Sequence, residues 1–287
     1  MADVTVIILT RNEEVNLPEC LKSLEGFAAR VVVVDSISTD STCDIARKRG
    51  AEVLSHPFEN YARQFNWGLD NAGITTKWTL RLDADERLTP ALCRELEGLM
   101  DAHASDDVNG VVMSAWLYFM GRRLTHARNM KRKLMLFKTG IGRIEDRHMD
   151  EHTLLARGTS VEAREKFLHY DFKDMNHYIN KLNWYAGREV RDYFAHIEGN
   201  ENTGRLDGAN QSMRNRKFGF YYRLPMFFRC WLMFVYSYVF RGGFLDGREG
   251  FLYHYMYHRF YRTLVDAKIY EHMKTGGPYE PLGALKD

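Results

Sequence analysis

Two aspartates separated by one residue, Asp83 and Asp85, offer the clearest chemistry in the sequence. They follow a hydrophobic run at residues 78–82 and precede a predicted helix. On an extended backbone, carboxylates at this spacing point to the same side. At the carboxyl end of a strand that side faces the ligand crevice of an α/β sheet, and paired hard oxygens suit Mg²⁺ or Mn²⁺ carrying a diphosphate. Taken alone, the pair and the following Glu86 could equally solvate a turn before a helix.

The elements that must position these aspartates are visible in the alternating pattern of the first hundred residues. Short β-branched apolar runs, typical of buried strands, occur at residues 4–9, 30–34, 51–54 and 78–82. Helical segments with capping residues separate them, and Asn60 is one predicted cap. Two further strands are expected at 108–116 and 133–137. Repeated units of this kind predict an α/β fold with a doubly wound, mostly parallel sheet.

Polar residues gather where these predicted strands end. Residues 10–13 follow the first strand, Asp35 follows the second, and Asp83 and Asp85 follow the fourth. Such loops share one crevice in an open α/β sheet, although polar loops follow strands in every protein of this class. The sequence contains neither a Gly-x-Gly-x-x-Gly turn after the first strand nor a Gly-x-x-x-x-Gly-Lys-Ser/Thr loop. A dinucleotide oxidoreductase and a P-loop phosphotransferase are therefore disfavoured.

Three segments, 4–17, 33–42 and 81–87, together resemble the family 2 glycosyltransferases of GT-A fold in order and spacing. The resemblance implies a nucleotide-sugar donor, Mg²⁺ or Mn²⁺ as cofactor, and inversion at the anomeric carbon. By the same resemblance Asp85 binds the metal, Asp83 faces the ribose or the sugar and adds to the metal site, and His169 approaches the metal or the diphosphate. The remaining donor-binding positions implied by the resemblance are Thr10, Arg11, Asn12, Glu13, Asp35, Arg63 and Gln64.

Transfer of a sugar also needs a general base that deprotonates the acceptor hydroxyl. Asp83 and Asp85 are too close on one segment to flank a glycosidic bond, which disfavours a hydrolase. Glu151 and Asp150 are the candidate bases, since inverting members of the family carry an acidic residue at about this point, and the choice between the two stays open. A solvated acidic turn is the alternative. The neighbouring histidines at 148 and 152 do not have the order of a His-Glu-x-x-His zinc site.

Composition limits the remaining possibilities. A formal net charge of +2 gives no indication of nucleic-acid binding. The four cysteines are dispersed, which is typical of reduced thiols in a cytoplasmic protein, and no signal peptide is recognised at the N-terminus.

The last third of the chain is rich in aromatic residues. Residues 224–240 are nearly all apolar, but they contain Arg229 and fall short of the roughly 20 residues that span a bilayer. Basic and aromatic flanks favour a segment lying in the headgroup region of an anionic leaflet, with a buried core helix or an oligomer interface as alternatives. The segment 242–247 ends in Asp246 and Gly247, which are expected to form a turn.

The sequence thus predicts a nucleotide-sugar-binding half at 1–110, an acceptor-binding half with the base at 111–200, and a helical, membrane-associating extension at 201–287. The predicted activity is inverting, metal-dependent transfer of a sugar to a saccharide or lipid-linked acceptor in bacterial surface-polysaccharide or lipopolysaccharide synthesis. The predicted location is the cytoplasmic face of the membrane, with the membrane surface as a partner. Alternatives are a non-catalytic nucleotide-sugar-binding or scaffold protein of the same fold, and a nucleotidyltransferase, although the latter lacks its Gly-rich basic loop.

Overall fold

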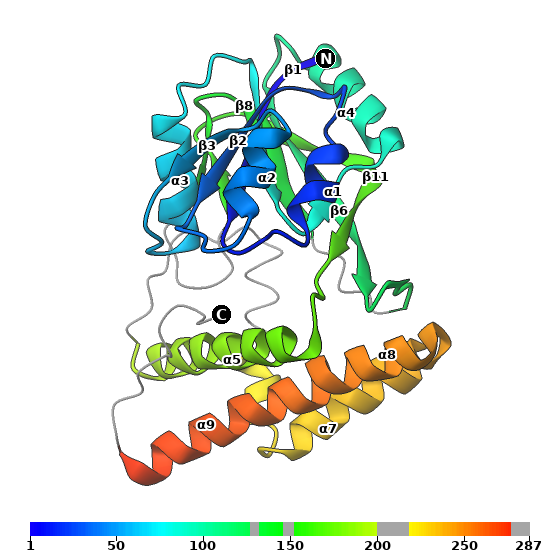
Figure 1. Ribbon diagram of the computed structural model, residues 1–287. Coiled ribbons are helices and arrows are strands. Elements are labelled where there is room, and N and C mark those ends of the chain that lie inside the picture. Colours follow the sequence, from blue (N-terminus) through cyan, green and yellow to red (C-terminus); the bar gives the residue numbers. More distant parts are fainter. Residues whose placement is uncertain (127–131, 146–151, 200–217, 277–287) are drawn as a thin grey trace. The chain divides into compact units, whose positions relative to one another are not determined.

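The structure divides the chain into two compact units (Figure 1). The computed structural model describes residues 1–126, 132–145, 152–199 and 218–276. The first unit consists of residues 1–118 and 129–171, and the second of residues 119–128 and 172–287. Strands dominate the first unit and helices the second. The predicted division at residues 110 and 200, which concerns function, stays a prediction.

A large β-sheet forms the centre of the first unit. Its strands are, in spatial order, β3 (Glu52–Ser55), β2 (Ala28–Asp35), β1 (Ala2–Thr10), β4 (Trp78–Asp83), β8 (Arg132–Lys138), β6 (Val108–Phe119), β11 (Thr159–Tyr170) and β5 (Glu86–Arg87). Strands β8 and β5 are antiparallel to their neighbours, and the other pairings in this order are parallel. A separate small sheet pairs β9 (Gly142–Ile144) with β10 (Thr153–Leu155). The prediction of a mostly parallel α/β sheet is confirmed.

Helices cover both faces of this sheet, as a doubly wound fold requires. On one face lie α1 (Leu17–Lys22), α2 (Thr42–Lys48) and α4 (Pro90–Ala102), and on the other lies α3 (Tyr61–Asn71). The alternation of side chains along β1 explains the two cores, because Val6 and Ile8 join the first apolar cluster while Ile7 joins Phe65 in the second. All four side chains are fully buried.

Capping residues fix where the helices begin. The Asn60 side chain accepts the backbone N–H of Arg63 at the start of α3, as the sequence predicts, and Thr89 accepts that of Leu92 at the start of α4. These caps fix where the connections before α3 and α4 end.

Strands β1, β2 and β4 are parallel, so the loops that follow them leave the sheet at the same carboxyl edge, where the candidate site is formed.

The second unit is helical. Its elements are the short strand β7 (Arg122–Arg123), α5 (Met175–Ile197), η1 (Tyr221–Arg223), α7 (Phe228–Val235), η2 (Tyr236–Phe240), η3 (Gly243–Asp246), α8 (Gly247–His254), η4 (Tyr255–Tyr261) and α9 (Arg262–Thr275). Helix α5 packs against α9, and α7 packs against η4. Tyr178, Leu182 and Ala186 of α5 are buried and form part of the core of this unit.

The apolar run at 224–240 folds as α7 and η2. Arg229, the charged residue within it, is buried and donates from its Nε and Nη2 atoms to the carboxylate of Asp266 on α9. One face of this segment is therefore core, although much of the other is exposed. Among the helices in the described ranges, none is both long enough and apolar enough to cross a membrane.

Asp246 does more than form a turn. Its carboxylate accepts the backbone N–H groups of Thr125 and His126 at 3.0 and 2.9 Å and the Thr125 hydroxyl at 2.8 Å. Gly242 and Gly247 on either side have φ values of 75° and 73°, which an L side chain rarely adopts. The segment 242–247 thus holds the chain after β7 in place.

Candidate active site

The carboxyl end of β4 carries the acidic residues in a sharper bend than the sequence suggests. Strand β4 ends at Asp83, Ala84 and Asp85 form a turn, and Glu86 begins β5. Strand β5 pairs antiparallel with β11, which sets His169 opposite Glu86. The expectation of one extended backbone through both aspartates is therefore wrong, because the turn sends their carboxylates to different neighbours.

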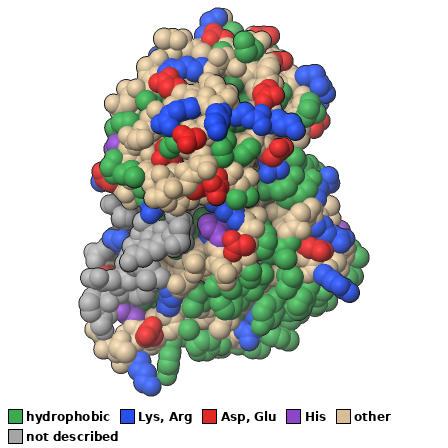
Figure 2. Space-filling view, viewed as in Figure 1, with side chains coloured by type: hydrophobic (Ala, Val, Ile, Leu, Met, Phe, Trp, Pro, Cys, Tyr) green, Lys and Arg blue, Asp and Glu red, His purple; other side chains and the backbone are tan. Residues whose placement is uncertain are grey.

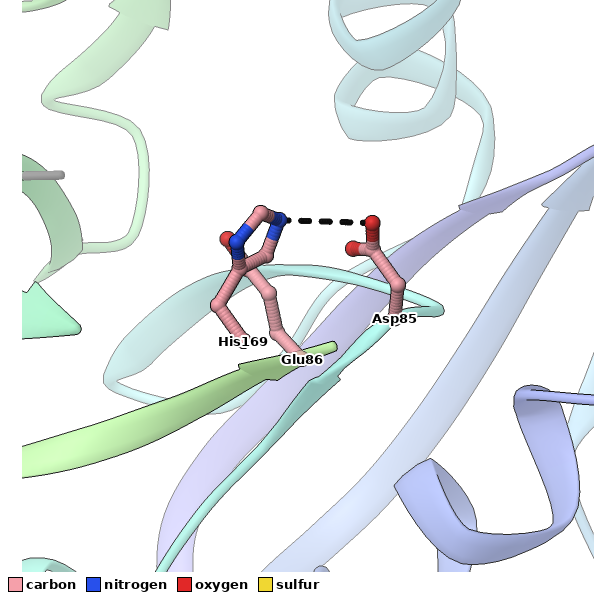
Figure 3. Close-up of side chains that lie close together, drawn as sticks. All are labelled: Asp85, Glu86 and His169. Carbon is pink, nitrogen blue, oxygen red and sulfur yellow. Dashed lines mark ion pairs between the residues drawn. The ribbon is translucent and has the colours of Figure 1, made fainter. Parts of the chain in front are cut away.

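Asp85 meets His169 across this pairing. The His169 Nε2 atom lies 3.3 Å from Asp85 Oδ2, and Figure 3 shows the two side chains pointing toward one another with Glu86 beside the imidazole ring. One ligand atom from each of Asp85, Glu86 and His169 lies within 4.8 Å of the others. His169 and Glu86 are buried, and Asp85 is partly exposed. Two carboxylates and an imidazole suit Mn²⁺, and the oxygens also suit Mg²⁺, so this donor set fits the predicted cofactor.

Asp83 belongs to a neighbouring hydrogen-bond network. The Tyr61 hydroxyl donates to its Oδ1 atom at 2.5 Å, and Lys133 Nζ donates to its Oδ2 atom at 3.2 Å. Arg81 donates from Nε to the Tyr61 hydroxyl at 2.8 Å. Lys133 also lies 3.5 Å from Glu86 Oε1, so one ammonium group joins Asp83 to the Glu86 carboxylate of the metal-site candidate.

The network holds its charges in definite protonation states. Burial would raise the pKa of Asp83, but the nearby Lys133 and Arg81 outweigh it and hold that pKa well below its usual range. Burial lowers the pKa of Lys133, yet Asp83 and Glu86 together raise it above its ordinary value. Burial raises the pKa of Glu86 even though Lys133 opposes the shift. Asp83 is therefore an anion and Lys133 a cation at neutral pH.

The loops after β1 and β2 form the other side of this edge. The Thr10 hydroxyl donates to Asp35 Oδ1 at 2.8 Å, and the Ser38 N–H donates to Asp35 Oδ2 at the same distance. Asn12 accepts the N–H of Thr39 through its side-chain oxygen at 2.9 Å. The structure thus brings residues 10–13 together with Asp35, and the buried Asp35 carboxylate fixes the shape of both loops.

The two α3 residues differ in their surroundings. Gln64 is fully buried, where its Nε2 donates to the Ser36 hydroxyl at 3.0 Å and its Oε1 lies 2.8 Å from His56 Nδ1. Arg63 lies on the surface with its guanidinium 2.6 Å from Glu59. Gln64 thus stabilises the loop after β2 through its hydrogen bond to Ser36. A role for Arg63 in nucleotide binding stays a prediction. The candidate bases, Asp150 and Glu151, lie outside the described residues.

Sequence reasoning missed four side chains of this site, namely Tyr61, Arg81, Lys133 and, as a ligand candidate, Glu86. Arg81 could have been found, because a charged residue inside the apolar run 78–82 needs a buried partner. Lys133 begins the strand expected at 133–137, and its position in β8 places its side chain beside Asp83, a contact that the local pattern does not indicate. Nothing in the local pattern around Tyr61 indicates its contact with Asp83.

The fold and this site agree with one class of enzyme. A mostly parallel sheet with acidic residues clustered at its carboxyl edge, and without a Gly-rich phosphate loop, is the arrangement expected of a GT-A glycosyltransferase. Residues 5–166 match the family described as glycosyl transferase family 2, and the chain belongs to that family. The family assignment and the fold class predicted from the sequence are confirmed.

Two sequence relatives agree with this assignment, and one solved structure shows a weaker likeness. An uncharacterized glycosyltransferase of Rickettsia typhi is 24% identical over 207 residues, covering 67% of this chain and 68% of the relative. The lipopolysaccharide core biosynthesis glycosyltransferase LpsC of Rhizobium meliloti is 30% identical over 190 residues, covering 64% and 68%. Glucosyl-3-phosphoglycerate synthase from Mycobacterium tuberculosis, solved with Mn²⁺ and UDP, gives a TM-score of 0.33 at 20% identity. That match spans 40% of this chain and 44% of the solved one.

Proposed function

We propose that the chain transfers a sugar, with inversion, from a nucleotide-diphosphate sugar to a saccharide or lipid-linked acceptor in bacterial cell-surface polysaccharide or lipopolysaccharide synthesis. The observation that carries the proposal is the gathering of Asp85, Glu86 and His169 at the carboxyl edge of the sheet. The loops around Asp35 lie at the ends of β1 and β2 along the same edge. The relationship to LpsC supports a lipopolysaccharide-type acceptor.

The donor half of the reaction falls to the first unit. Asp85, Glu86 and His169 would hold Mn²⁺ or Mg²⁺. A bound divalent cation neutralises the charge that develops on the leaving diphosphate. Asp83 and the loop at 10–13 would hold the ribose and the base, with Asp35 fixing the loop conformation and Arg63 close to the nucleotide. Lys133 and Tyr61 keep Asp83 ionised and in place, so its carboxylate is preorganised for a hydroxyl donor.

The acceptor half needs a base on the opposite face of the sugar. We assign that role to Glu151, with Asp150 as the alternative. The base takes the proton of the acceptor hydroxyl while the acceptor oxygen bonds to the anomeric carbon. The bond from that carbon to the diphosphate oxygen breaks at the same time, and the nucleotide leaves as its diphosphate. Attack from the face opposite the leaving group inverts the configuration.

A panel of nucleotide sugars tests the proposal. The full chain is incubated with each donor, Mn²⁺ or Mg²⁺, and membrane extract as the source of acceptor, and nucleotide release is followed. We expect acceptor-dependent release that a chelator stops. Glu151→Ala should abolish turnover while donor binding is retained, and Asp150→Ala identifies the base if Glu151→Ala stays active. Binding of a nucleotide sugar without release by the wild-type chain would favour the non-catalytic alternative, and turnover unaffected by chelator would contradict the metal site.

A further inference from the structure

The second unit has an unusual distribution of apolar and polar side chains. Large apolar residues are exposed along two neighbouring segments, and we call this surface the aromatic face. Its members are Phe228, Trp231, Tyr236, Val239 and Phe240 on α7 and η2, and Phe244, Leu245, Phe251 and Tyr255 on η3, α8 and η4. Phe240 is 78% exposed, and each of the others is more than 40% exposed. Figure 2 shows hydrophobic side chains gathered over the region of α7 and α8.

These segments lie side by side. Phe234 of α7 contacts both Phe251 and Tyr255 through edge-on ring packing, with centroid distances of 6.2 and 6.0 Å. Tyr238 contacts Phe251 at 5.6 Å. The exposed residues of the two segments therefore belong to one continuous surface, because the rings between them are packed against each other.

The opposite sides of the same segments bury polar groups. Arg229, Ser237, His254 and His258 are at most 6% exposed, whereas the aromatic residues one turn away face outward. A helix on a water-facing surface shows the reverse order, with polar groups outward and rings in the core. Contiguous exposed apolar surface of this kind marks an interaction site. The inward polar side also excludes a reading of the whole 224–240 run as a simple core helix.

Positive charge accompanies the aromatic face on its own segments. Arg248 on α8 is exposed, and the guanidinium of Arg241 lies 5.9 Å from the Tyr236 ring centre. On the acidic side, Glu249 is engaged by Arg122 at 3.4 Å. Arg229 and Arg262 do not contribute to this surface, since Asp266 and Glu189 neutralise them inside the unit. An excess of surface cations beside exposed rings favours an anionic partner. It disfavours a second copy of the same face, which would bring like charges together.

We propose that the aromatic face lies in the headgroup region of an anionic bilayer, with its rings entering the acyl boundary and its arginines contacting lipid phosphates. Trp and Tyr suit this depth because one end of each side chain is apolar and the other forms hydrogen bonds. The proposal concerns the second unit alone and does not depend on the transfer reaction. It replaces the single segment expected from the sequence with two paired segments, and it places Arg229 in the core and away from the lipid.

Vesicle co-sedimentation of the full chain tests this proposal. We expect binding to phosphatidylcholine vesicles that contain phosphatidylglycerol, and much weaker binding to pure phosphatidylcholine. The triple variant Trp231→Ser, Phe240→Ser and Phe251→Ser should weaken binding to the mixed vesicles by roughly tenfold or more, because buried apolar area drives insertion. Ile197→Ser is the matched control, since Ile197 is 60% exposed on α5 and outside the aromatic face. It should bind as the wild type does.

A charge variant separates the electrostatic part. Arg241→Gln with Arg248→Gln should weaken binding to the mixed vesicles and leave binding to neutral vesicles unchanged, and added salt should reduce the difference between this variant and the wild type. Circular dichroism and thermal unfolding confirm that each variant is folded. Wild-type chain that stays in the supernatant, or a folded triple variant that binds as tightly as the wild type, overturns the proposal. A concentration-dependent dimer that the triple variant loses would assign the face to a second copy and also overturn it. Nucleotide release is not the readout, so failure here leaves the proposed activity intact.

Discussion

Both units bury charged side chains, but the surroundings of those charges differ. In the helical unit, Arg229 and Asp266 are each 1% exposed and pair with each other at 2.5 Å. In the first unit, Asp83, Asp85 and Glu86 gather at one strand end, with Lys133 shared between two of them. The first arrangement joins helices, whereas the second collects carboxylates where ligands bind. Buried charges therefore indicate a binding site when several carboxylates gather at the carboxyl edge of a sheet, and not when one carboxylate and one guanidinium pair between helices.

Glu189 provides a second example of the structural kind. Its carboxylate accepts hydrogen bonds from the hydroxyls of Tyr222 and Tyr261 and from Arg262, so both oxygens have donors from other helices. Burial raises the pKa of Tyr222 and Tyr261, and the anionic Glu189 raises it further. Both tyrosines consequently stay protonated and act as donors. Such a closed network leaves no ligand position, in contrast to the group around Asp85.

The largest expected effect follows from removing a proposed ligand. Asp85→Ala should lower nucleotide release by on the order of 10³-fold, because charge stabilisation worth several kcal/mol is lost at the diphosphate. Metal-dependent nucleotide binding, measured by calorimetry, should disappear as well. Asp101→Ala, at an exposed position on α4, is the matched control and should retain full turnover. Normal release by the Asp85 variant would remove the distinction between the two kinds of buried charge.

Breaking the ion pair of the helical unit should lower the free energy of unfolding. Arg229→Met leaves the Asp266 carboxylate buried without its cation, and we expect a loss of about 3 kcal/mol or more in the free energy of unfolding by urea. Arg223→Met, at an exposed position, should change little. The double variant Arg229→Met with Asp266→Leu should recover much of the loss, since two apolar side chains tolerate burial. If the single variant is as stable as the wild type, the pair does not hold the helices together.

Acid should weaken the helical unit before it affects the carboxylates. Burial lowers the pKa of His254 to about 4, with Asp246 opposing and Arg241 adding to the shift, and burial together with His254 lowers the pKa of His258 to about 3. Unfolded histidine titrates near pH 6.5. Stability is therefore complete above about pH 6.5 and falls as the pH drops toward 4, by roughly 1.4 kcal/mol per histidine for each pH unit.

Urea titrations between pH 7 and 5 check this dependence. The variant His254→Gln with His258→Gln should lose most of the slope, because its side chains do not titrate in this range. Ile197→Ser, at an exposed position on α5 whose side chain carries no titrating group, is the control and should leave the slope unchanged. Equal slopes in the wild type and the double variant would contradict the assignment.

The smallest expected effect concerns the support of Asp83. Tyr61→Phe removes the hydroxyl that donates to Asp83 and accepts from Arg81. We expect KM for the donor to rise roughly tenfold, the equivalent of one hydrogen bond to a charged group, with a smaller change in kcat. Tyr270→Phe on α9, where the side chain is 52% exposed, should have no effect. A change in kcat alone would place Tyr61 in the chemical step and not in positioning.

The fold was largely predictable because its signals are local. The β-branched runs that became β1, β2 and β4, and the cap at Asn60, depend on neighbouring residues within one turn or strand. The family resemblance over three segments then identified the class of enzyme. The exact site was less predictable: the strand ended at Asp83, and Glu86 lies with Asp85 and His169 within ligand distance, while Asp83 as a metal ligand stays a prediction. The two-residue turn at Ala84 and Asp85 changes which carboxylates face one another, and hydrophobic periodicity does not reveal such a turn.

The sequence by itself determined the order of strands and helices along the chain, the strand ends that carry polar loops, and the apolar character of residues 224–240. Only the tertiary structure decided which distant residues meet. Lys133 reaches Asp83 because β8 lies between β4 and β6 in the sheet. The positive charge of Arg229 is balanced because Asp266 on α9 packs against it. Propensities and periodicity act over a few residues, whereas the partner of a buried charge is set by how whole elements pack.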